Sequence, residues 1–438
     1  MSLASIEWRR GWRIVIASLA GMTFSNAQLS LLGLMIRPLS TAFGWSRAEI
    51  SASALISSVC VLVGAPIAGR LADRFSPRVV ALLGVVIFSV AQVCVGFSGP
   101  LIESWYASWV FAGLAYAIIS PVVWSYGVNR WFDKARGLAL AVALSGTGIA
   151  GSIAPLLAVQ GIDLFGWRGV YFSIAGIGIL LVLPLVWLLF RMPADYSARR
   201  GSTLRTSSEG WKNIRNRTFW MLGAAIALLG AGMGTLAVHV QPIMRDAGLS
   251  AQRAATFASF MGLSQVFGRL LVGQLLDRFP TRLVAAVAFA MPLVAAVLLI
   301  PYRGGTPESI AICVAIGLAL GAEVDVMAYL TSRYFGLANY GLSYAILFGL
   351  WGVSFGVSSV ASGAIYDITK SYGLVLRCVI LFLFFSSVLV ALTRPPPPRD
   401  QDQDQDQEQD QDQGQAREQA EALERDALQE AVRPADFG

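Results

Sequence analysis

Three ionisable side chains lie deep inside long apolar stretches of this sequence. Arg269 falls in the stretch 252–272, and Glu323 and Asp325 fall in the stretch 309–331. A charge held at the centre of a lipid bilayer costs roughly 2.5–3.5 kcal/mol by insertion scales, so such residues usually have a function. A guanidinium can hold a planar carboxylate through two parallel hydrogen bonds, and a carboxyl group can carry a proton. The three residues predict either a binding site for an acidic solute or a static ion pair between two helices.

Both interpretations need these charges at a similar depth in the membrane. At a rise of about 1.5 Å per residue, Arg269 and the two acids lie within a few ångströms of one another in depth if their stretches run in the same direction. Glu323 and Asp325 are two positions apart, or about 200° around a helix, so at most one of them faces Arg269 squarely. We expect Arg269 to bind the solute and one acid to take up a proton or balance the charge.

Further polar and aromatic side chains in the apolar stretches are candidates to surround these charges. The polar candidates for lining a solute cavity are Asn26, Gln28, Ser145, Thr147 and Gln265. The aromatic candidates, which either shape an apolar sub-pocket or simply pack, are Tyr116, Tyr344 and Trp351.

The pattern of the sequence does not favour metal or enzyme chemistry. The single histidine, His239, ends the stretch 218–240, where an interfacial position is expected. The four cysteines lie singly in apolar stretches, without the spacing of metal ligands. The stretches hold no nucleophile–base or paired-aspartate constellation, and the sequence has no G-x-x-x-x-G-K-[ST] loop. We therefore expect no metal, no cofactor, no enzymatic activity and no ATP-driven pumping by this chain.

The composition is that of a membrane protein. Hydrophobic residues make up 55% of the 438 positions and charged residues 14%, against roughly a quarter charged in soluble domains. The apolar residues form blocks of about 20, the length that an α-helix needs to cross about 30 Å of hydrocarbon. In lipid every backbone polar group must be bonded within its own segment, so the blocks predict helices. The twelve predicted spans are 12–35, 50–68, 79–97, 104–124, 137–160, 169–190, 218–240, 252–272, 283–301, 309–331, 342–364 and 372–393.

The basic residues predict the orientation of these spans. With twelve spans, both termini and the loops that follow even-numbered spans lie on one side of the membrane. This side carries 24 of the 33 Lys and Arg residues, whereas the opposite side carries seven. Basic residues gather on the cytoplasmic side of membrane proteins. We therefore expect a multi-pass protein of the cell membrane with both termini in the cytoplasm. We interpret the basic surplus as this signal, and not as a surface for nucleic acid.

One block of the sequence occurs twice. GRLADRFSPR begins at Gly69, and GQLLDRFPTR begins at Gly273, 204 residues later. The same offset relates several other pairs of positions, which indicates two six-helix halves of common origin. An even number of spans in each half makes them parallel repeats, related by an axis along the membrane normal.

The repeat divides the chain into four predicted parts. They are a six-helix bundle at 1–190, a cytoplasmic linker at 191–217, a second six-helix bundle at 218–393 and an acidic cytoplasmic tail at 394–438. The linker is basic and rich in serine, which suits a segment beside anionic lipid headgroups. The tail alternates Gln and Asp after four prolines, so we expect it to be disordered.

The duplicated block, with the pattern G-x-L-A-D-R-x-x-x-R in its first copy, resembles the cytoplasmic loop motif of the major facilitator superfamily. The two copies follow predicted spans 2 and 8, and the resemblance covers about residues 8–393. It implies an all-α fold of two pseudo-symmetric six-helix bundles, with charge networks that stabilise the state closed to the cytoplasm. The residues that the resemblance assigns to this cytoplasmic gate are Asp73, Arg74, Arg130, Asp277, Arg278 and Arg333.

Within that superfamily, three stretches resemble the branch of monocarboxylate porters and oxalate–formate exchangers. They are 43–51, 130–139 and 268–273. The resemblance implies that spans 8 and 10 both line the cavity of the second half, which would let Arg269 meet one of the acids. Two positions depart from the animal members, because Ser30 stands where they have a substrate-linked lysine and Gln265 where they have an aspartate.

The resemblance and the intramembrane charges together predict a secondary active transporter. We expect it to move a small organic anion, a monocarboxylate or an aromatic acid, by alternating access, driven by protons or by exchange. The alternative is an efflux porter for apolar or cationic compounds, in which the acids bind the solute and Arg269 is their counter-ion. A third hypothesis is a sensor that no longer transports. The expected partners are the solute, protons and the lipid bilayer, and we expect a monomer.

Overall fold

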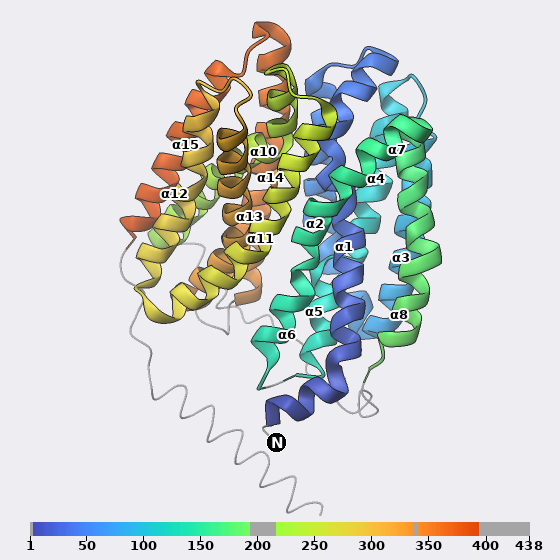
Figure 1. The fold of residues 1–438 in the computed structure, drawn as a ribbon. Coiled ribbons are helices and arrows are strands. Elements are labelled where there is room, and N and C mark those ends of the chain that lie inside the picture. Colours follow the sequence, from blue (N-terminus) through green and yellow to red (C-terminus); the bar gives the residue numbers. More distant parts are fainter. Residues whose placement is uncertain (1–2, 133, 193–215, 336–339, 394–438) are drawn as a thin grey trace, which may run out of the picture. The chain divides into compact units, whose positions relative to one another are not determined.

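The structure is a computed structural model that describes residues 3–132, 134–192, 216–335 and 340–393 (Figure 1). The predicted tail 394–438 and most of the predicted linker 191–217 lie outside the described residues. The side chains of Asp73, Arg74 and Asp277 also lie outside what the structure describes.

Helices make up nearly all of the described part of the chain, and no strand occurs in it. The first half contains α1 (Leu3–Phe43), α2 (Arg47–Phe75), α3 (Pro77–Gly96), α4 (Ile102–Ile118), α5 (Pro121–Asn129), α6 (Arg136–Leu144), α7 (Gly146–Ile177), the π-helical turn η1 (Gly178–Val182) and α8 (Leu183–Leu189). The second half contains α10 (Arg217–Asp246), α11 (Ala251–Arg278), α12 (Thr281–Leu299), α13 (Thr306–Phe335), α14 (Tyr340–Thr369) and α15 (Gly373–Ala391).

Eleven helical segments of the described residues are long and apolar enough to cross a membrane, and the longest of them contains two predicted spans. This segment runs over 54 residues from Arg136 to Leu189, or about 80 Å, which is more than twice the thickness of the hydrocarbon. Gly166 breaks it with backbone angles of φ 70° and ψ 175°, which glycine adopts without strain. The predicted spans 137–160 and 169–190 meet at this break, and the expected twelve-span fold is confirmed.

The starts of α2 and α11 repeat the same local structure at the offset of the duplicated block. Gly44 and Gly248 have positive φ values of 73° and 94°. Ser46 and Ser250 then cap the two helices, each side chain accepting the N–H of the third helical residue. A left-handed glycine suits the end of one helix and a serine the start of the next. The internal repeat predicted from the sequence therefore has a repeated turn as its counterpart in the structure.

Each half packs mainly within itself, and three helix pairs form the largest contacts between the halves. In the first half α1 and α3 pack on α7, and α2 packs on α4. In the second half α10 packs on α14, α11 on α13, and α12 on α15. Across the halves, α2 packs on α14, α7 on α11 and α1 on α10. These seams surround the region in which the intramembrane charges lie.

The side chain of His239 is enclosed by neighbouring helices. The helix α10 continues for seven residues beyond it, and its side chain is 0% exposed. Its Nδ1 lies 2.9 Å from the Tyr372 hydroxyl and its Nε2 lies 2.9 Å from the Ser359 carbonyl oxygen. His239 is therefore buried between α10, α14 and the start of α15, and its expected interfacial position stays a prediction.

Candidate functional site

A central cavity of about 280 Å³ lies between the two halves of the described structure. Its walls come from α1, α2, α4, α5, α6 and α7 of the first half and from α10, α11, α13 and α14 of the second. Arg269, Glu323 and Asp325 all line it, and Arg269 is the single cation among the described lining residues. The three charges singled out in the sequence thus share one cavity.

Arg269 is anchored at two points. Its Nε donates to Asp325 Oδ2 at 3.1 Å, and its Nη1 donates to the Leu144 carbonyl oxygen of α6 at 2.8 Å. The Arg269 side chain is 10% exposed and that of Asp325 is 31% exposed. The guanidinium is therefore held by both halves of the molecule, through a carboxylate of the second half and a backbone carbonyl of the first.

Glu323 lies in a different environment from Asp325. It is 4% exposed, and its Oε2 accepts a hydrogen bond from Trp351 Nε1 at 3.3 Å. Trp351 stacks on Phe348 at 5.5 Å between ring centroids and contacts Phe355 at 5.4 Å. The expectation that at most one acid faces Arg269 therefore fits the structure, in which Asp325 bonds the guanidinium and Glu323 bonds an aromatic wall on α14.

Close approach of α11 and α13 brings the charges together. A Cβ atom at Gly317 would collide with the Met261 carbonyl oxygen, and one at Gly321 would collide with the Gln265 carbonyl oxygen. Because glycine has no Cβ, the two backbones can touch along this line. Asp325 follows Gly321 by about one turn, so this backbone contact places it within hydrogen-bond distance of Arg269.

Uncharged polar groups line the remainder of the cavity. Gln265 Nε2 donates to Thr147 Oγ1 at 3.2 Å, which links α11 to α7. On the first half, the Tyr116 hydroxyl donates to Asn26 Oδ1 at 3.3 Å. All four residues line the cavity, as the sequence analysis expected of them.

Three predicted lining residues lie elsewhere. Gln28 is buried and accepts a hydrogen bond from Gln92 Nε2 at 2.7 Å, within the first half. Ser145 donates to the Val142 carbonyl oxygen of its own helical turn. Tyr344 stacks on Phe348 at 5.8 Å and does not itself line the cavity. These three side chains lie in apolar stretches, as expected, but they point from their helices in directions that do not reach the cavity.

The residues assigned to a cytoplasmic gate stay a prediction. The side chains of Asp73, Arg74 and Asp277 lie outside the described part of the structure. Arg130 donates to the Tyr126 hydroxyl at 2.8 Å, Arg278 is exposed and Arg333 is half-buried.

A charged cluster at the opposite ends of the helices was missed in the sequence. Asp246, at the end of α10, lies 2.9 Å from Arg47 Nη1 and 3.0 Å from Arg37 Nη2. Asp367, near the end of α14, accepts the backbone N–H groups of Arg47 and Ala48. The available signal was the presence of two aspartates beside span ends on a side with seven basic residues.

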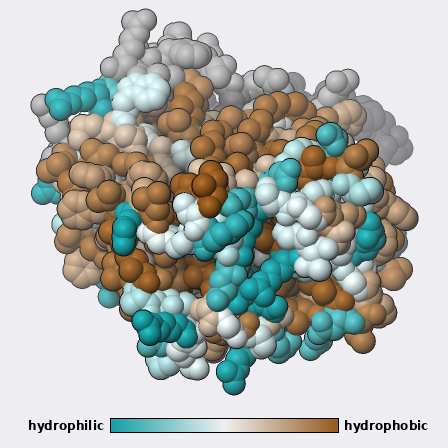
Figure 2. Space-filling model, turned by 90° about the horizontal axis from the view of Figure 1, so that it is seen from above, coloured by the Kyte–Doolittle hydropathy of each residue, from teal (hydrophilic) through white to brown (hydrophobic). Residues whose placement is uncertain are grey.

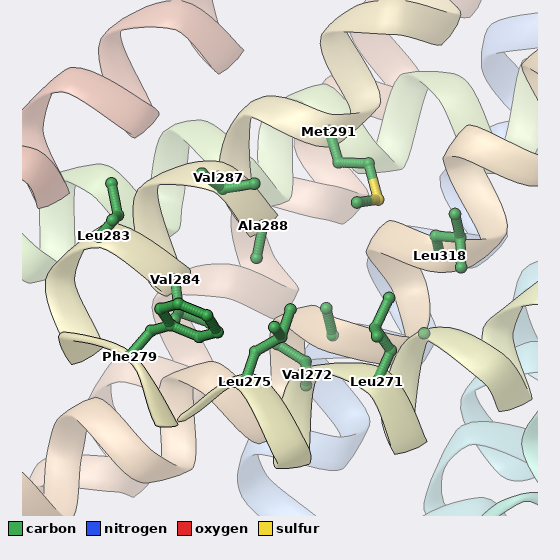
Figure 3. Close-up of a pocket in the computed structure, with 12 residues that line it drawn as sticks. Leu271, Val272, Leu275, Phe279, Leu283, Val284, Val287, Ala288, Met291 and Leu318 are labelled. Carbon is green, nitrogen blue, oxygen red and sulfur yellow. The ribbon is translucent and has the colours of Figure 1, made fainter. Parts of the chain in front are cut away.

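A second cavity of about 260 Å³ lies among α11, α12 and α13 (Figure 3). Phe279 and Leu283 lie at the left of the view and Leu318 lies at the right. Its described lining side chains are all apolar, so it offers no group that would orient a charged solute. The central cavity is therefore the candidate site.

Two helical halves around a central cavity that contains three charged side chains are the architecture of a multi-pass membrane protein. Residues 15–341 match the family described as the Major Facilitator Superfamily, and the chain belongs to that family. A transporter, rather than an enzyme, is what this membership indicates.

Curated relatives agree with this assignment. The chain is 27% identical over 333 residues to "Monocarboxylate transporter 11" of Homo sapiens, covering 72% of this chain and 69% of that protein. It is 26% identical over 395 residues to "Uncharacterized MFS-type transporter YcxA" of Bacillus subtilis (strain 168), covering 87% of this chain and 94% of that one. The predicted family and the resemblance to its monocarboxylate branch are confirmed.

Solved structures share the fold. The nucleoside transporter NupG superposes with a TM-score of 0.68 at 15% identity, covering 87% of this chain and 97% of that one. A bacterial homolog of the human lysosomal transporter Spinster, in an inward-facing and unoccupied conformation, superposes with a TM-score of 0.66 at 18% identity, covering 87% and 96%. At these identities the likeness concerns the fold alone.

Proposed function

We propose that this chain is a secondary active transporter that carries a small organic anion, a monocarboxylate or an aromatic acid, by alternating access, coupled to protons or to a counter-anion. The observation that supports this proposal best is Arg269, the single cation among the described residues that line the central cavity. The similarity to monocarboxylate transporters agrees with it.

Arg269 keeps donors for a ligand. A guanidinium has five N–H groups, and acceptors in the described part of the protein take two of those of Arg269, one on Asp325 and one on Leu144. The remaining N–H groups can hold a carboxylate, while the two anchored ones fix the plane of the guanidinium. This arrangement favours a planar anion over a neutral solute.

The charge balance of the cavity supplies a reason for proton coupling. With both acids ionised, the described lining carries one positive and two negative charges, which would repel an anion. Asp325 is paired with Arg269, whereas Glu323 has the Trp351 indole as its hydrogen-bond partner. A proton on Glu323 would remove the excess negative charge, so we infer that Glu323 is the proton carrier and that proton and anion bind together.

The aromatic wall of α14 suits the apolar body of such an anion. Phe348, Trp351 and Phe355 all line the cavity and pack on one another along one face of the helix. Aromatic side chains provide flat apolar surfaces on which a ring can stack. This wall is our reason to include aromatic acids in the proposed substrate class.

The competing function is efflux of cationic or apolar compounds. It is favoured by one observation, because Glu323 lacks a cation in direct contact among the described residues and could itself bind an amine. The two functions therefore differ in which charge of the cavity meets the substrate.

Three ring compounds of similar size and different charge distinguish these functions. We would measure the thermal unfolding of purified protein with benzoate, benzylamine and benzyl alcohol, for wild type and for Arg269→Lys. We expect benzoate to stabilise wild type, and to stabilise Arg269→Lys much less, because an ammonium cannot form the two-pronged contact. Arg253→Lys, a change of an exposed arginine on the same helix, is the matched control.

Two results would contradict the proposal. Equal stabilisation of wild type and Arg269→Lys by benzoate would remove Arg269 from the site. Stabilisation by benzylamine alone would favour the efflux function over anion transport.

Uptake into proteoliposomes tests the coupling role of Glu323. If proton and anion bind together, benzoate uptake should rise as the pH on the substrate side falls. Glu323→Gln, which resembles the protonated carboxyl, should lose this response and keep benzoate exchange. Unchanged pH dependence in Glu323→Gln would assign proton coupling to another group.

We further propose that the protein lies in the cell membrane as a monomer, with both termini in the cytoplasm. The basis for the orientation is the excess of basic residues on one side of the membrane in the predicted arrangement of spans, 24 against seven. A thiol reagent applied outside intact cells should then label Thr306→Cys and leave Ser208→Cys unmodified. The reverse pattern would invert the orientation.

A further inference from the structure

The ends of four helices meet in one charged cluster at the end of the molecule that carries the loops 44–46, 247–250 and 370–372. Arg47 at the start of α2 forms two contacts with the Asp246 carboxylate, Nη1 to Oδ2 at 2.9 Å and Nη2 to Oδ1 at 3.0 Å. Arg37 of α1 reaches the same carboxylate at 3.0 Å. Figure 2 shows hydrophilic residues gathered across the middle of this face, between hydrophobic sides. The cluster joins α1 and α2 of the first half to α10 of the second.

Arg47 is held by aromatic groups as well as by Asp246. Its guanidinium carbon lies 3.6 Å from the centroid of the Tyr366 ring, and its Nη1 donates to the Tyr372 hydroxyl at 2.9 Å. The Tyr372 hydroxyl in turn lies 2.9 Å from Nδ1 of the buried His239. Asp246, Tyr366 and Tyr372 all belong to the second half. Arg47 is therefore a side chain of the first half that the second half binds.

A second acid of the second half binds the backbone of α2. Asp367 Oδ1 accepts the N–H of Arg47 at 3.1 Å, and its Oδ2 accepts the N–H of Ala48 at 3.0 Å. These N–H groups belong to the first turn of a helix, where they have no partner inside the helix and where the macrodipole favours an anion. Asp367 therefore bonds the N-terminus of α2 across the boundary between the halves.

The helix α2 does not need Asp367 in order to begin. Ser46 Oγ accepts the N–H of Glu49 at 3.2 Å, and Glu49 Oε2 accepts the N–H of Ser46 at 2.8 Å. This reciprocal capping box closes the helix start with residues of its own segment. The contact with Asp367 can therefore break without unwinding α2.

Gly363 allows α14 to come this close to α2. A Cβ atom at Gly363 would lie 2.7 Å from the Ala48 nitrogen and 2.8 Å from the Arg47 carbonyl carbon. One at Gly356, about two turns deeper in α14, would collide with Leu55 of α2. The backbones are thus in contact from the charged cluster towards the central cavity, and larger side chains on α14 would hold them apart.

We propose that Arg47, Asp246, Asp367 and Gly363 form the outer gate of the transporter, which closes the central cavity on this side and opens by separation of α2 from α14. The contacts of Arg47, Asp246 and Asp367 cross the boundary between the halves and involve charged groups that water can solvate when they part, whereas the backbone contact at Gly363 sets how closely α14 approaches α2. The helix start is capped independently, so opening leaves the fold intact. The proposal rests on transport by alternating access and does not depend on the charge of the substrate.

The gate is tested by access to the cavity, without any substrate. A reporter, Ser58→Cys, would be placed on the cavity wall of α2 in a protein whose four native cysteines have been replaced. We would measure the rate at which a membrane-impermeant maleimide labels this cysteine when the reagent is added on the side of the loops 44–46. Asp367→Asn removes the charge at the α2 N-terminus, and we expect labelling to become faster by roughly tenfold.

The matched control for this variant is Asp163→Asn, which changes an exposed acid of α7. We expect the control to leave the labelling rate unchanged, and both variants to keep the melting temperature of the parent. Equal labelling rates in Asp367→Asn and Asp163→Asn would overturn the gate. No substrate is added in this assay. Its outcome therefore does not depend on whether the protein binds an organic anion.

A steric series provides an independent readout if Asp367→Asn folds poorly. Gly363→Ala and Gly363→Val should raise the labelling rate in that order, because each added group wedges α14 further from α2. The same changes at Gly176, where a Cβ atom would meet nothing within 4 Å, should have no effect. A labelling rate that does not respond to the size of residue 363 would contradict the proposal.

Discussion

The two seams that the repeat relates, α2 against α14 and α7 against α11, both contain close backbone contacts at glycines, but α2–α14 also carries charged contacts at its outer end. At the outer end of α2–α14, arginine and aspartate side chains bridge the halves. In α7–α11, Gly262 lies against the backbone of Gly148 and Gly151, and a Cβ atom at Gly262 would collide with Ser152 nitrogen. The sequence offset places Ala251 in α11 where α2 has Arg47, so the ionic contact has no equivalent there.

This difference suggests different roles for the two seams. Ion pairs near the surface contribute little net free energy, because water solvates the separated charges well. Backbone contacts between glycines lose their dispersion attraction when they part and gain little in return. Both seams have such contacts, but only the outer end of α2–α14 among the described residues of the two seams gains solvation of charged groups when it parts. We infer that α2–α14 opens at this outer end while α7–α11 stays in contact and acts as the pivot. The pivot also carries Arg269 and Gln265, the cavity residues that bond to the first half.

The largest effect is expected from a bulky side chain at the pivot. Gly262→Val places a branched side chain against the backbone of α7, and overpacking of this kind costs roughly 1–3 kcal/mol or more. Thermal unfolding in detergent should show a clearly lower melting temperature and lost transport. Gly137→Val, at a site where a Cβ atom meets nothing within 4 Å, is the control. A stable, active Gly262→Val would rule out the pivot.

The next effect concerns the ion pair inside the cavity. Arg269→Met and Asp325→Leu each leave one charge without its 3.1 Å partner, so each single variant should unfold at a lower temperature. The double variant should recover part of this loss, with a coupling of roughly 0.5–3 kcal/mol. Additive losses, with no recovery, would mean that the pair does not stabilise the seam.

A smaller, opposite effect is expected at the predicted cytoplasmic gate. If Asp73 stabilises the state closed to the cytoplasm, Asp73→Asn should shift the population towards the state closed on the outer side. The Ser58→Cys reporter should then be labelled more slowly from outside, whereas Asp367→Asn makes it faster. Labelling that changes in the same direction in both variants would show that the two sites do not act as opposing gates.

The smallest effect is expected from salt. Arg37 is 46% exposed and Asp246 is 25% exposed, so ions can screen part of the outer cluster. Raising the salt concentration from about 0.01 M to 1 M should speed up labelling of Ser58→Cys by a few fold. The melting temperature of the protein should stay unchanged, because the glycine contacts of α7–α11 carry no charge. Insensitivity of the labelling rate to salt would argue that backbone packing at Gly363, and not charge, keeps the outer side closed.

Several features of this protein were determined by the sequence alone. The length of each apolar block predicts a membrane span, because a helix crossing the hydrocarbon must bond all of its own backbone. The duplicated block at Gly69 and Gly273 predicts two halves, and the cost of a buried charge marks Arg269, Glu323 and Asp325 as a shared site. These properties are local, or depend on depth alone, so no knowledge of the packing was needed.

Other features were decided by the tertiary structure. The choice of Asp325 over Glu323 as the partner of Arg269, the burial of Gln28 away from the cavity and the contacts of Arg47 all depend on the direction in which a helix faces. That direction follows from close contacts between helices, as at Gly321, and hydropathy does not encode it. Arg47 and Asp367 lie 320 positions apart in the chain. Only the packing of the two halves brings them together.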